Sequence, residues 1–341
     1  MHLTDFWFLV IAILWIGYFF LEGFDFGVGI LVGVVARDDR ERRVLINTIG
    51  PVWDGNEVWL LTAGGATFAA FPVWYATLFS GFYLALLVIL VCLIVRGVAF
   101  EFRGKRSGRR WQRNWEHALF VTSLLVAFLW GVAFANIVRG VKIDADEVYV
   151  GGFWDLINGY ALLGGFTTLF LFTFHGAAFA ALKTLGPIRA RVRRAALLTG
   201  GVTAVLASAF LIWTQVDQGL GATPPGGLGG GWSLAALIIA VVALVSALAF
   251  ARLQRDGWSF ALSGVTVVAA VAMLFLSLYP DVLPSSLDPS WSLTVSNASS
   301  ANYTLTVMTI VACVMTPVVL AYQAWTYWVF RRRIGVSAIP Q

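Results

Sequence analysis

Long runs of apolar residues dominate the chain, and short polar or charged stretches separate them. A run of about 20 apolar residues is long enough to cross the hydrocarbon core of a bilayer as a helix. Because backbone groups that face lipid must be satisfied within their own segment, helices are the expected structure. The pattern predicts an all-α, polytopic membrane protein of nine transmembrane helices. The predicted spans are residues 6–35, 44–71, 76–95, 118–138, 153–182, 195–216, 232–251, 257–279 and 303–330.

Composition points to the same class of protein. Of the 341 residues, 59% are hydrophobic and only 12% are charged, and the mean hydropathy is +0.82. The start, MHLTD, has neither a basic region nor a small-residue cleavage site, so the first span is expected to be a retained helix. No polar stretch is long enough for a separate soluble domain, so residues 1–341 are expected to form a single integral-membrane domain.

The positions of lysine and arginine predict the orientation in the membrane. Alternate connections between the predicted spans, together with the C-terminal tail, hold 21 of the 23 basic residues, and only Arg139 and Lys142 lie on the other side. Since cytoplasmic loops carry the excess of basic residues, we expect the N-terminus outside and the C-terminus in the cytoplasm. The net charge of +5 therefore reflects topology, and no nucleic-acid partner is expected.

A weak internal repeat suggests two related halves. A shift of 150 residues superposes Phe24 on Phe174, Asp25 on His175 and Arg43 on Arg193. The repeat predicts two four-helix halves, residues 1–140 and 151–280, followed by a ninth helix at 303–330. With four spans in each repeat, the halves would be parallel and related by an axis along the membrane normal. The match is only a few residues long, so chance remains an alternative.

Four carboxylates lie within the first two predicted spans: Glu22, Asp25, Asp54 and Glu57. An ionised side chain at the centre of a bilayer costs about 2.5 to 3.5 kcal/mol, so acids there normally serve a function or have a partner. The two members of each pair are three residues apart and so share a helix face. We predict that these four acids form the functional site.

The spacing predicts that the two acidic pairs meet. The turn between the first two spans centres near residues 39 and 40, so Asp25 and Asp54 are each about 14 residues from it. They should therefore lie at similar depth on adjacent helices. We expect small residues four apart to let these two helices approach, and these residues are Gly23, Gly27, Gly29 and Gly33. We also expect the helical hydrogen bonds at the start of the second helix to be interrupted near Pro51, Gly55 and Asn56, so that freed carbonyl groups and the Asn amide could hold water.

The energetic cost of burying an acid is compatible with two different roles for these residues. They are either structural, for instance paired with Arg96 at the inner end of the third span, or they move protons, because burial favours the protonated form of an acid. A proton-coupled secondary transporter would also place acids at mid-depth, although the chain lacks paired broken helices in both halves. A purely structural assembly subunit is the third alternative.

Histidine is too scarce for this chain to hold haem by itself. Haem in a helical bundle needs axial His or Met, and only His117 and His175 lie in or beside predicted spans, with four Met in all. A single histidine in a span is more often a hydrogen-bonded core residue than a ligand. The Glu-x-x-His repeats of a di-iron site are absent from the sequence, and no metal site is expected.

Several motifs together resemble subunit II of cytochrome bd, the bacterial quinol oxidase, over nearly the whole chain. The motifs are Gly23-Phe24-Asp25-Phe26-Gly27-Val28-Gly29, Glu41-Arg42-Arg43, Trp53-Asp54-Gly55-Asn56-Glu57-Val58-Trp59-Leu60, Thr62-Ala63-Gly64-Gly65, Phe79-Ser80-Gly81-Phe82-Tyr83, Leu283-Pro284-Ser285-Ser286 and Ala324-Trp325-Thr326-Tyr327-Trp328. Each motif alone is a weak signal, but the set is specific.

The resemblance implies a nine-helix subunit in the bacterial cell membrane, paired with a homologous subunit I. That partner would carry two b-type haems, one d-type haem and the quinol-oxidising loop. The complex would reduce dioxygen to water with electrons from quinol, with menaquinol as the expected quinol, and would take protons from the cytoplasm. Small single-helix subunits, bound lipids and a structural quinone in this chain stay open.

The resemblance also implies roles for the acids. Asp54 is similar to the acid assigned to proton delivery toward the oxygen-reducing haem, and Asp25 is similar to one that supports the interface or haem environment. Glu57 departs from relatives that carry Gln, and Glu22 stands where an Asp can occur. The neighbouring residues expected in the haem environment or at the subunit interface are Trp53, Asn56, Arg96 and His175.

Overall fold

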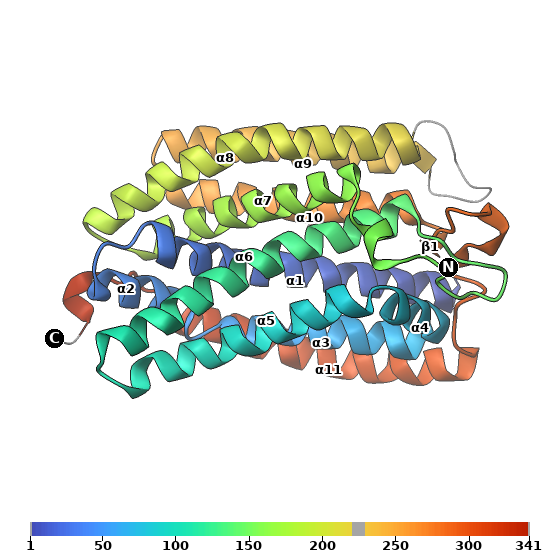
Figure 1. Cartoon of the computed structure of the whole chain (residues 1–341), viewed down its shortest axis with the longest axis horizontal. Helices are drawn as coiled ribbons and strands as arrows, with labels where there is room; N and C mark the ends of the chain where they lie inside the picture. The colour runs from blue at the N-terminus through green and yellow to red at the C-terminus, as the bar shows by residue number, and fades with distance from the viewer. Residues whose placement is uncertain (1, 220–228, 340–341) are drawn as a thin grey trace.

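The computed structural model describes residues 2–219 and 229–339, and it is predominantly helical (Figure 1). The helices are α1 (Leu3–Val34), α2 (Asp39–Ile49), α3 (Trp53–Ala70), α4 (Pro72–Gly81), α5 (Tyr83–Phe102), α6 (Arg109–Arg139), α7 (Gly159–Lys183), α8 (Pro187–Thr214), α9 (Gly229–Arg252), α10 (Asp256–Leu278) and α11 (Asn302–Val329). Short 3₁₀ or π turns cover Arg103–Lys105, Phe153–Leu156, Gln215–Gly219, Pro289–Trp291 and Val336–Ala338. The connection before α11 adds a small antiparallel sheet, β1 (Asp281–Leu283) with β2 (Leu293–Thr294), which the all-α prediction did not include.

The long helices lie roughly parallel, with α1, α6, α7 and α10 in mutual contact at the centre (Figure 1). Helices α8 and α9 flank this central group on one side, and α3, α5 and α11 flank it on the other. Within the second half of the chain α7 packs on α8 and α10, as α1 packs on α3 and α6 within the first. The division into two repeated halves nevertheless stays a prediction.

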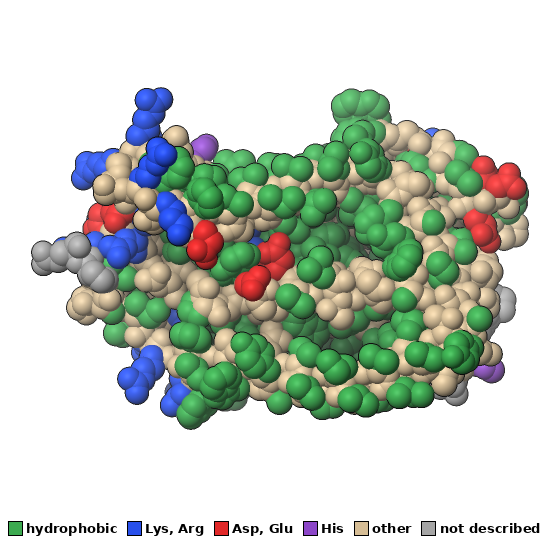
Figure 2. Space-filling model, turned by 90° about the horizontal axis from the view of Figure 1, so that it is seen from below, with side chains coloured by type: hydrophobic (Ala, Val, Ile, Leu, Met, Phe, Trp, Pro, Cys, Tyr) green, Lys and Arg blue, Asp and Glu red, His purple; other side chains and the backbone are tan. Residues whose placement is uncertain are grey.

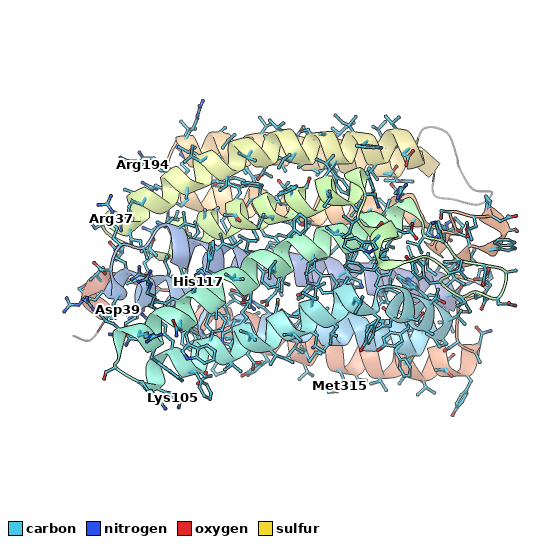
Figure 3. All side chains as sticks on the ribbon, in the orientation of Figure 1. Arg37, Asp39, Lys105, His117, Arg194 and Met315 are labelled. Carbon is cyan, nitrogen blue, oxygen red and sulfur yellow. The ribbon has the colours of Figure 1, made fainter. Side chains whose placement is uncertain are left out.

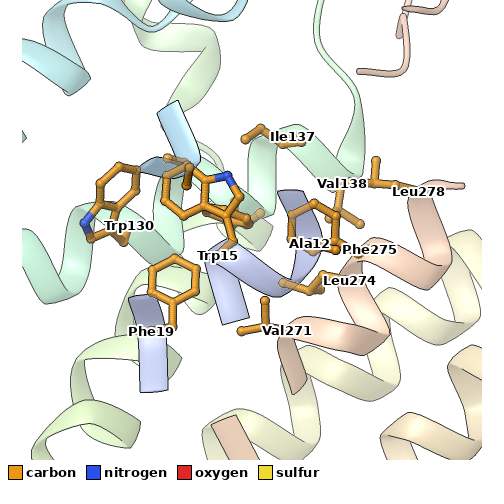
Figure 4. Close-up of a cluster of buried hydrophobic side chains, with 14 of the residues drawn as sticks. Ala12, Trp15, Phe19, Trp130, Ile137, Val138, Val271, Leu274, Phe275 and Leu278 are labelled. Atoms are coloured by element: carbon orange, nitrogen blue, oxygen red, sulfur yellow. The ribbon is translucent and has the colours of Figure 1, made fainter. Parts of the chain in front are cut away.

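Aromatic side chains fill the contact between α1, α6 and α10 (Figure 4). The Trp15 ring lies edge-on to Trp130 and Phe134, with ring centroids 5.1 and 4.9 Å apart. Trp130 donates a hydrogen bond of 3.0 Å from its indole nitrogen to the hydroxyl of Tyr18, so the polar atoms of this pair are satisfied inside the bundle. Edge-to-face contacts of this kind add about 0.5 to 1.5 kcal/mol per pair beyond the burial of their area.

The glycines of α1 allow close helix crossings, as predicted, but with other partners than the second predicted span. An ideal Cβ at Gly27 would lie 2.0 Å from the carbonyl oxygen of Phe172 in α7, and one at Gly29 would lie 2.2 Å from the Ser123 hydroxyl in α6. The small-residue spacing therefore brings α1 against α7 and α6. Spacing along one helix identifies a face for close approach, but it does not identify the helix that approaches.

The second predicted span, 44–71, is broken into α2 and α3. Helix α2 ends at Ile49, and Pro51, which has no backbone N–H and restricts the residue before it, stands in the gap. The third predicted span, 76–95, begins within α4 and continues in α5 after a break at Phe82. An apolar window cannot distinguish a continuous helix from two helices with a short break.

Among the residues that the structure describes, eight helices are long and apolar enough to cross a membrane: α1, α5, α6, α7, α8, α9, α10 and α11. Helix α3 is not among them, because its first turns carry Asp54, Asn56 and Glu57. The count of nine spans therefore stays a prediction. Helices α6 and α8 begin nine and eight residues before their predicted spans, since their first turns are rich in arginine and were excluded by hydropathy.

Basic residues gather at one end of the bundle, where the described chain also ends (Figures 2 and 3). Arg37, Lys105 and Arg194 all lie there, whereas the N-terminus lies at the opposite end (Figures 1 and 3). Several of these arginines pair with acids at the same end. Arg103, for instance, donates to Glu116 and to Asp39. Which end faces the cytoplasm stays a prediction from the distribution of charge.

The crossing of α1 and α7 yields a test of the fold. We expect Gly27→Ala to destabilise the protein by about 1 to 3 kcal/mol, because the new methyl group would overlap backbone atoms of α7 that cannot move aside. The matched control is Gly201→Ala in α8, whose Cβ would have no atom within 4 Å. Thermal unfolding in detergent measures both variants, and equal midpoints for the two would contradict this packing.

Candidate functional site

A buried ion pair joins α1 to α5. Glu22 and Arg96 form a salt bridge, and both side chains are 0% exposed. The guanidinium carbon of Arg96 lies 4.7 Å from the centre of the Phe26 ring and 5.3 Å from that of Phe100. Cation–π contacts of this kind are strongest where water is excluded. Arg96 is therefore held by a carboxylate and two aromatic faces.

Asp25, one turn further along α1, belongs to a second polar group. Its Oδ2 accepts a hydrogen bond of 2.7 Å from the side-chain amide of Asn56 in α3. The Asn56 oxygen in turn accepts 2.7 Å from the Tyr327 hydroxyl and 3.3 Å from the Gln323 amide, both in α11. Asp25 and Asn56 are completely buried. Asn56 is two residues from Asp54, so this hydrogen bond places the first turns of α3 beside Asp25.

Helix α11 contacts the bundle through this polar group, although most of its surface is exposed. Gln323 Oε1 accepts a hydrogen bond of 2.9 Å from the Trp59 indole of α3. Gln323 and Tyr327 are four residues apart and so present the same face toward Asn56. Sequence reasoning missed both as site residues, although a glutamine inside an apolar helix, with a tyrosine one turn on, was a usable signal.

Polar atoms at the centre of the site lack protein partners. Glu22 Oε2, Asp25 Oδ1 and the Nε and Nη2 atoms of Arg96 are buried and make no hydrogen bond within the described residues. Arg96 also interacts electrostatically with Asp25 and Glu57 besides its partner Glu22. Buried polar groups normally find partners, in protein or in ordered water. The group can therefore accept and donate further hydrogen bonds.

The structure separates the four acids that the sequence placed together. Glu22 and Asp25 are buried, whereas Asp54 is exposed and Glu57 is partly exposed. The expectation that Asp54 lies inside a pocket between the first two helices is therefore wrong. Asp54 and Asn56 are neighbours on α3 but point in different directions, because successive helical residues are rotated by about 100°. Asn56, not Asp54, faces Asp25.

The remaining predicted residues lie near the site or away from it. Trp53 stacks on Phe100 with a centroid distance of 5.0 Å and thus covers the Arg96 region. His175 is fully buried in α7, where its neighbours are other residues than those of the polar site. Its Nδ1 is 2.7 Å from the Ser263 hydroxyl and its Nε2 is 3.1 Å from the Phe20 carbonyl oxygen. His175 is a hydrogen-bonded core residue.

Comparison with known proteins identifies the family. The family model described as cytochrome bd terminal oxidase subunit II matches residues 3–330. The chain belongs to this family. Among its relatives, cytochrome bd ubiquinol oxidase subunit 2 of Bacillus subtilis is 45% identical, and the match covers 98% of this chain and 97% of that protein. Cytochrome bd-I ubiquinol oxidase subunit 2 of Escherichia coli K12 is 35% identical, with 98% and 96% covered.

A solved structure supports the fold. A chain of the bd oxidase from Geobacillus thermodenitrificans superposes with a TM-score of 0.76, covering 97% of this chain and 99% of that chain at 18% identity. Together with its apolar helices, membership of the cytochrome bd subunit II family makes this chain a multi-pass bacterial membrane protein. The family also decides against the alternative of a secondary transporter.

The described histidines of this cytochrome bd subunit are either hydrogen-bonded in the core or exposed. Both ring nitrogens of His175 are within hydrogen-bond distance of protein atoms, so neither is available as an axial ligand. His2 and His117 are exposed, and His117 lies at the rim of an open groove rather than inside the core of the bundle. No described histidine is therefore both enclosed and free to ligate a haem iron.

The ion pair yields a double-mutant test. Arg96→Met leaves Glu22 buried without its partner, and we expect a loss of about 3 to 5 kcal/mol in stability. Adding Glu22→Gln removes the unpaired charge and should restore more than half of that loss. Melting temperature and the yield of assembled protein measure both effects. If the two substitutions were simply additive, Glu22 and Arg96 would not be energetically coupled.

Proposed function

We propose that this chain is the haem-free second subunit of a cytochrome bd-type quinol oxidase. With a subunit I that carries two b-type haems and one d-type haem, it would couple oxidation of quinol, expected to be menaquinol, to reduction of dioxygen to water. Full-length similarity to cytochrome bd ubiquinol oxidase subunits supports this proposal. That no described histidine is both enclosed and free to ligate iron supports a division of labour between two subunits.

The side of the bundle formed by α3, α5 and α11 is the proposed docking surface for subunit I. Figure 2 shows a largely apolar surface on this side, with a small group of acidic side chains within it. Asp54 is exposed in the first turn of α3, and Glu57 is partly exposed one turn later. An acid facing lipid costs about 2.5 to 3.5 kcal/mol. A partner that covers this side would remove that cost and bring the acids to the interface.

The acids of this surface are proposed to deliver protons to the haem-bearing subunit. Asp54 and Glu57 lie on one face of α3, three residues apart. Behind them Asn56 positions Asp25 by a hydrogen bond, and the Asp25 Oδ1 atom makes no hydrogen bond within the described residues. Hydrogen-bonded hydroxyl and carboxyl groups, with intervening water, can pass a proton from one to the next. The single observation that carries this role is a buried carboxyl group directly behind acids on the proposed interface.

A structural role is favoured for Glu22. Its salt bridge with fully buried Arg96 is the arrangement expected of a pair that holds two helices together. The contacts support different roles for the four acids, because Glu22 pairs with Arg96, whereas Asp25, Asp54 and Glu57 have no basic hydrogen-bond partner within the described residues. We assign proton transfer to these three residues, with Asp54 nearest the partner.

Replacement of Asp54 tests the proposal. We expect Asp54→Asn to lower quinol-dependent oxygen uptake by about tenfold or more, since removing a proton-transfer group typically costs 10²- to 10⁴-fold. Haem absorbance of the purified complex should stay normal, because the substitution changes no buried contact of this chain.

The matched control is Asp146→Asn, which changes an exposed acid in the connection between α6 and α7, outside the helices of the proposed docking surface. It should keep normal oxygen uptake. Normal turnover of Asp54→Asn in a complex with intact haem spectra would rule out the relay, and loss of haem absorbance would indicate that Asp54 serves assembly instead.

A further inference from the structure

An open groove lies at the basic end of the bundle, away from the polar site. It lies between the end of α1, the start of α2 and the first half of α6, and its volume is about 830 Å³. Its residues include Gly33 of α1, Arg42 of α2, and four residues of α6, namely Arg113, the acid Glu116, His117 and Val121. Figure 3 shows His117 on α6 near this end.

One stripe of α6 changes from polar to apolar along the groove. Arg113, His117 and Val121 are four residues apart and therefore follow one another on the same face. Arg113 and His117 are exposed, and Val121 lies next to Phe120, which packs over Gly33. An ideal Cβ at Gly33 would be 2.6 Å from the Phe120 ring. The groove thus has a basic rim and an apolar wall.

The change of polarity coincides with the expected edge of the membrane. Helix α6 has 31 residues, and a helix of that length is on the order of 46 Å long, against about 30 Å of hydrocarbon. Its arginine-rich first turns must therefore project beyond the hydrocarbon. Trp111 and Trp115 lie in these turns, as is typical of side chains at the membrane interface.

The charges of the rim are not all balanced within the chain. Glu116 lies 3.3 Å from Arg42 Nε and 2.6 Å from Arg103 Nη2, and Arg103 also pairs with Asp39. Arg113 makes no ion pair within residues 2–219 and 229–339. His117 makes no hydrogen bond or ion pair within the described residues, and its ring centroid lies 6.3 Å from that of Phe120. Positive charge is therefore in excess at the open side of the groove.

We propose that this groove binds an anionic phospholipid. The headgroup phosphate lies against Arg113 and His117, with Arg42 behind them, and an acyl chain follows Val121 and Phe120 toward the membrane centre. Basic pockets between transmembrane helices on the cation-rich side are suited to such headgroups. The apolar wall distinguishes this ligand from free phosphate, which would gain nothing from Val121 and Phe120.

The test is a lipid titration of the purified complex, followed by native mass spectrometry. Dioleoylphosphatidylglycerol is the probe, dioleoylphosphatidylcholine is the zwitterionic comparison, and inorganic phosphate is the competitor. We expect phosphatidylglycerol to bind at least about fivefold more tightly than phosphatidylcholine, and Arg113→Gln to weaken it about fivefold, as expected for one basic group near a membrane surface. Arg113→Gln with His117→Gln should weaken binding further.

Arg110→Gln is the matched control, because it removes the same charge from the first turn of α6 at an exposed position that does not line the groove. It should change phosphatidylglycerol binding by less than about twofold. An equal loss in Arg110→Gln would show diffuse attraction rather than a site. Unchanged binding in the double variant, or displacement of the lipid by inorganic phosphate, would also overturn the proposal. The lipid-free melting temperature verifies that each variant is folded.

Discussion

The salt bridge between Glu22 and Arg96 is the constraint on which the site depends. A single charge at the centre of a membrane costs about 2.5 to 3.5 kcal/mol, so neither residue is tolerable there without the other. Their pairing fixes α5 against α1 and leaves Arg96 between the rings of Phe26 and Phe100. Asp25, one turn away, then has α3 and α11 as its neighbours. Asn56 of α3 links these helices, because it donates to Asp25 and accepts a hydrogen bond from Tyr327 of α11.

This arrangement explains why the two sides of the bundle differ. The central group of α1, α6, α7 and α10 is packed with aromatic rings and close glycine contacts, whereas polarity is concentrated on the side of α3, α5 and α11. Helix α11 is held by the polar group and by hydrogen bonds from the Trp7 indole of α1 near its start, and most of its surface is exposed, which suits a surface that another subunit covers. The proposed proton route and the proposed docking surface are thus consequences of the same polar residues.

Much of the fold could be predicted from hydropathy, because the length of an apolar run can be compared directly with the thickness of the membrane. The predicted bounds of α10 and α11 are each within one residue of the structure. The break at Pro51 was not predicted as an end of a helix, since the flanking residues are apolar on both sides. Arg96 was named as a partner, but the Tyr327 contact joins residues 271 positions apart, and no local pattern encodes it. The position of Asp54 was predicted wrongly, because spacing in the sequence gives the place of a residue along its own helix but not the direction in which it faces the other helices.

The most direct test of the central claim is redox-induced infrared difference spectroscopy of the assembled complex. If Asp25 exchanges a proton with its surroundings during turnover, the wild type shows a carboxyl band that disappears in Asp25→Asn. The band should remain in Asp146→Asn, which changes an exposed acid of the connection between α6 and α7. An identical carboxyl region in the wild type and Asp25→Asn would contradict the account and leave the buried group with a structural role alone.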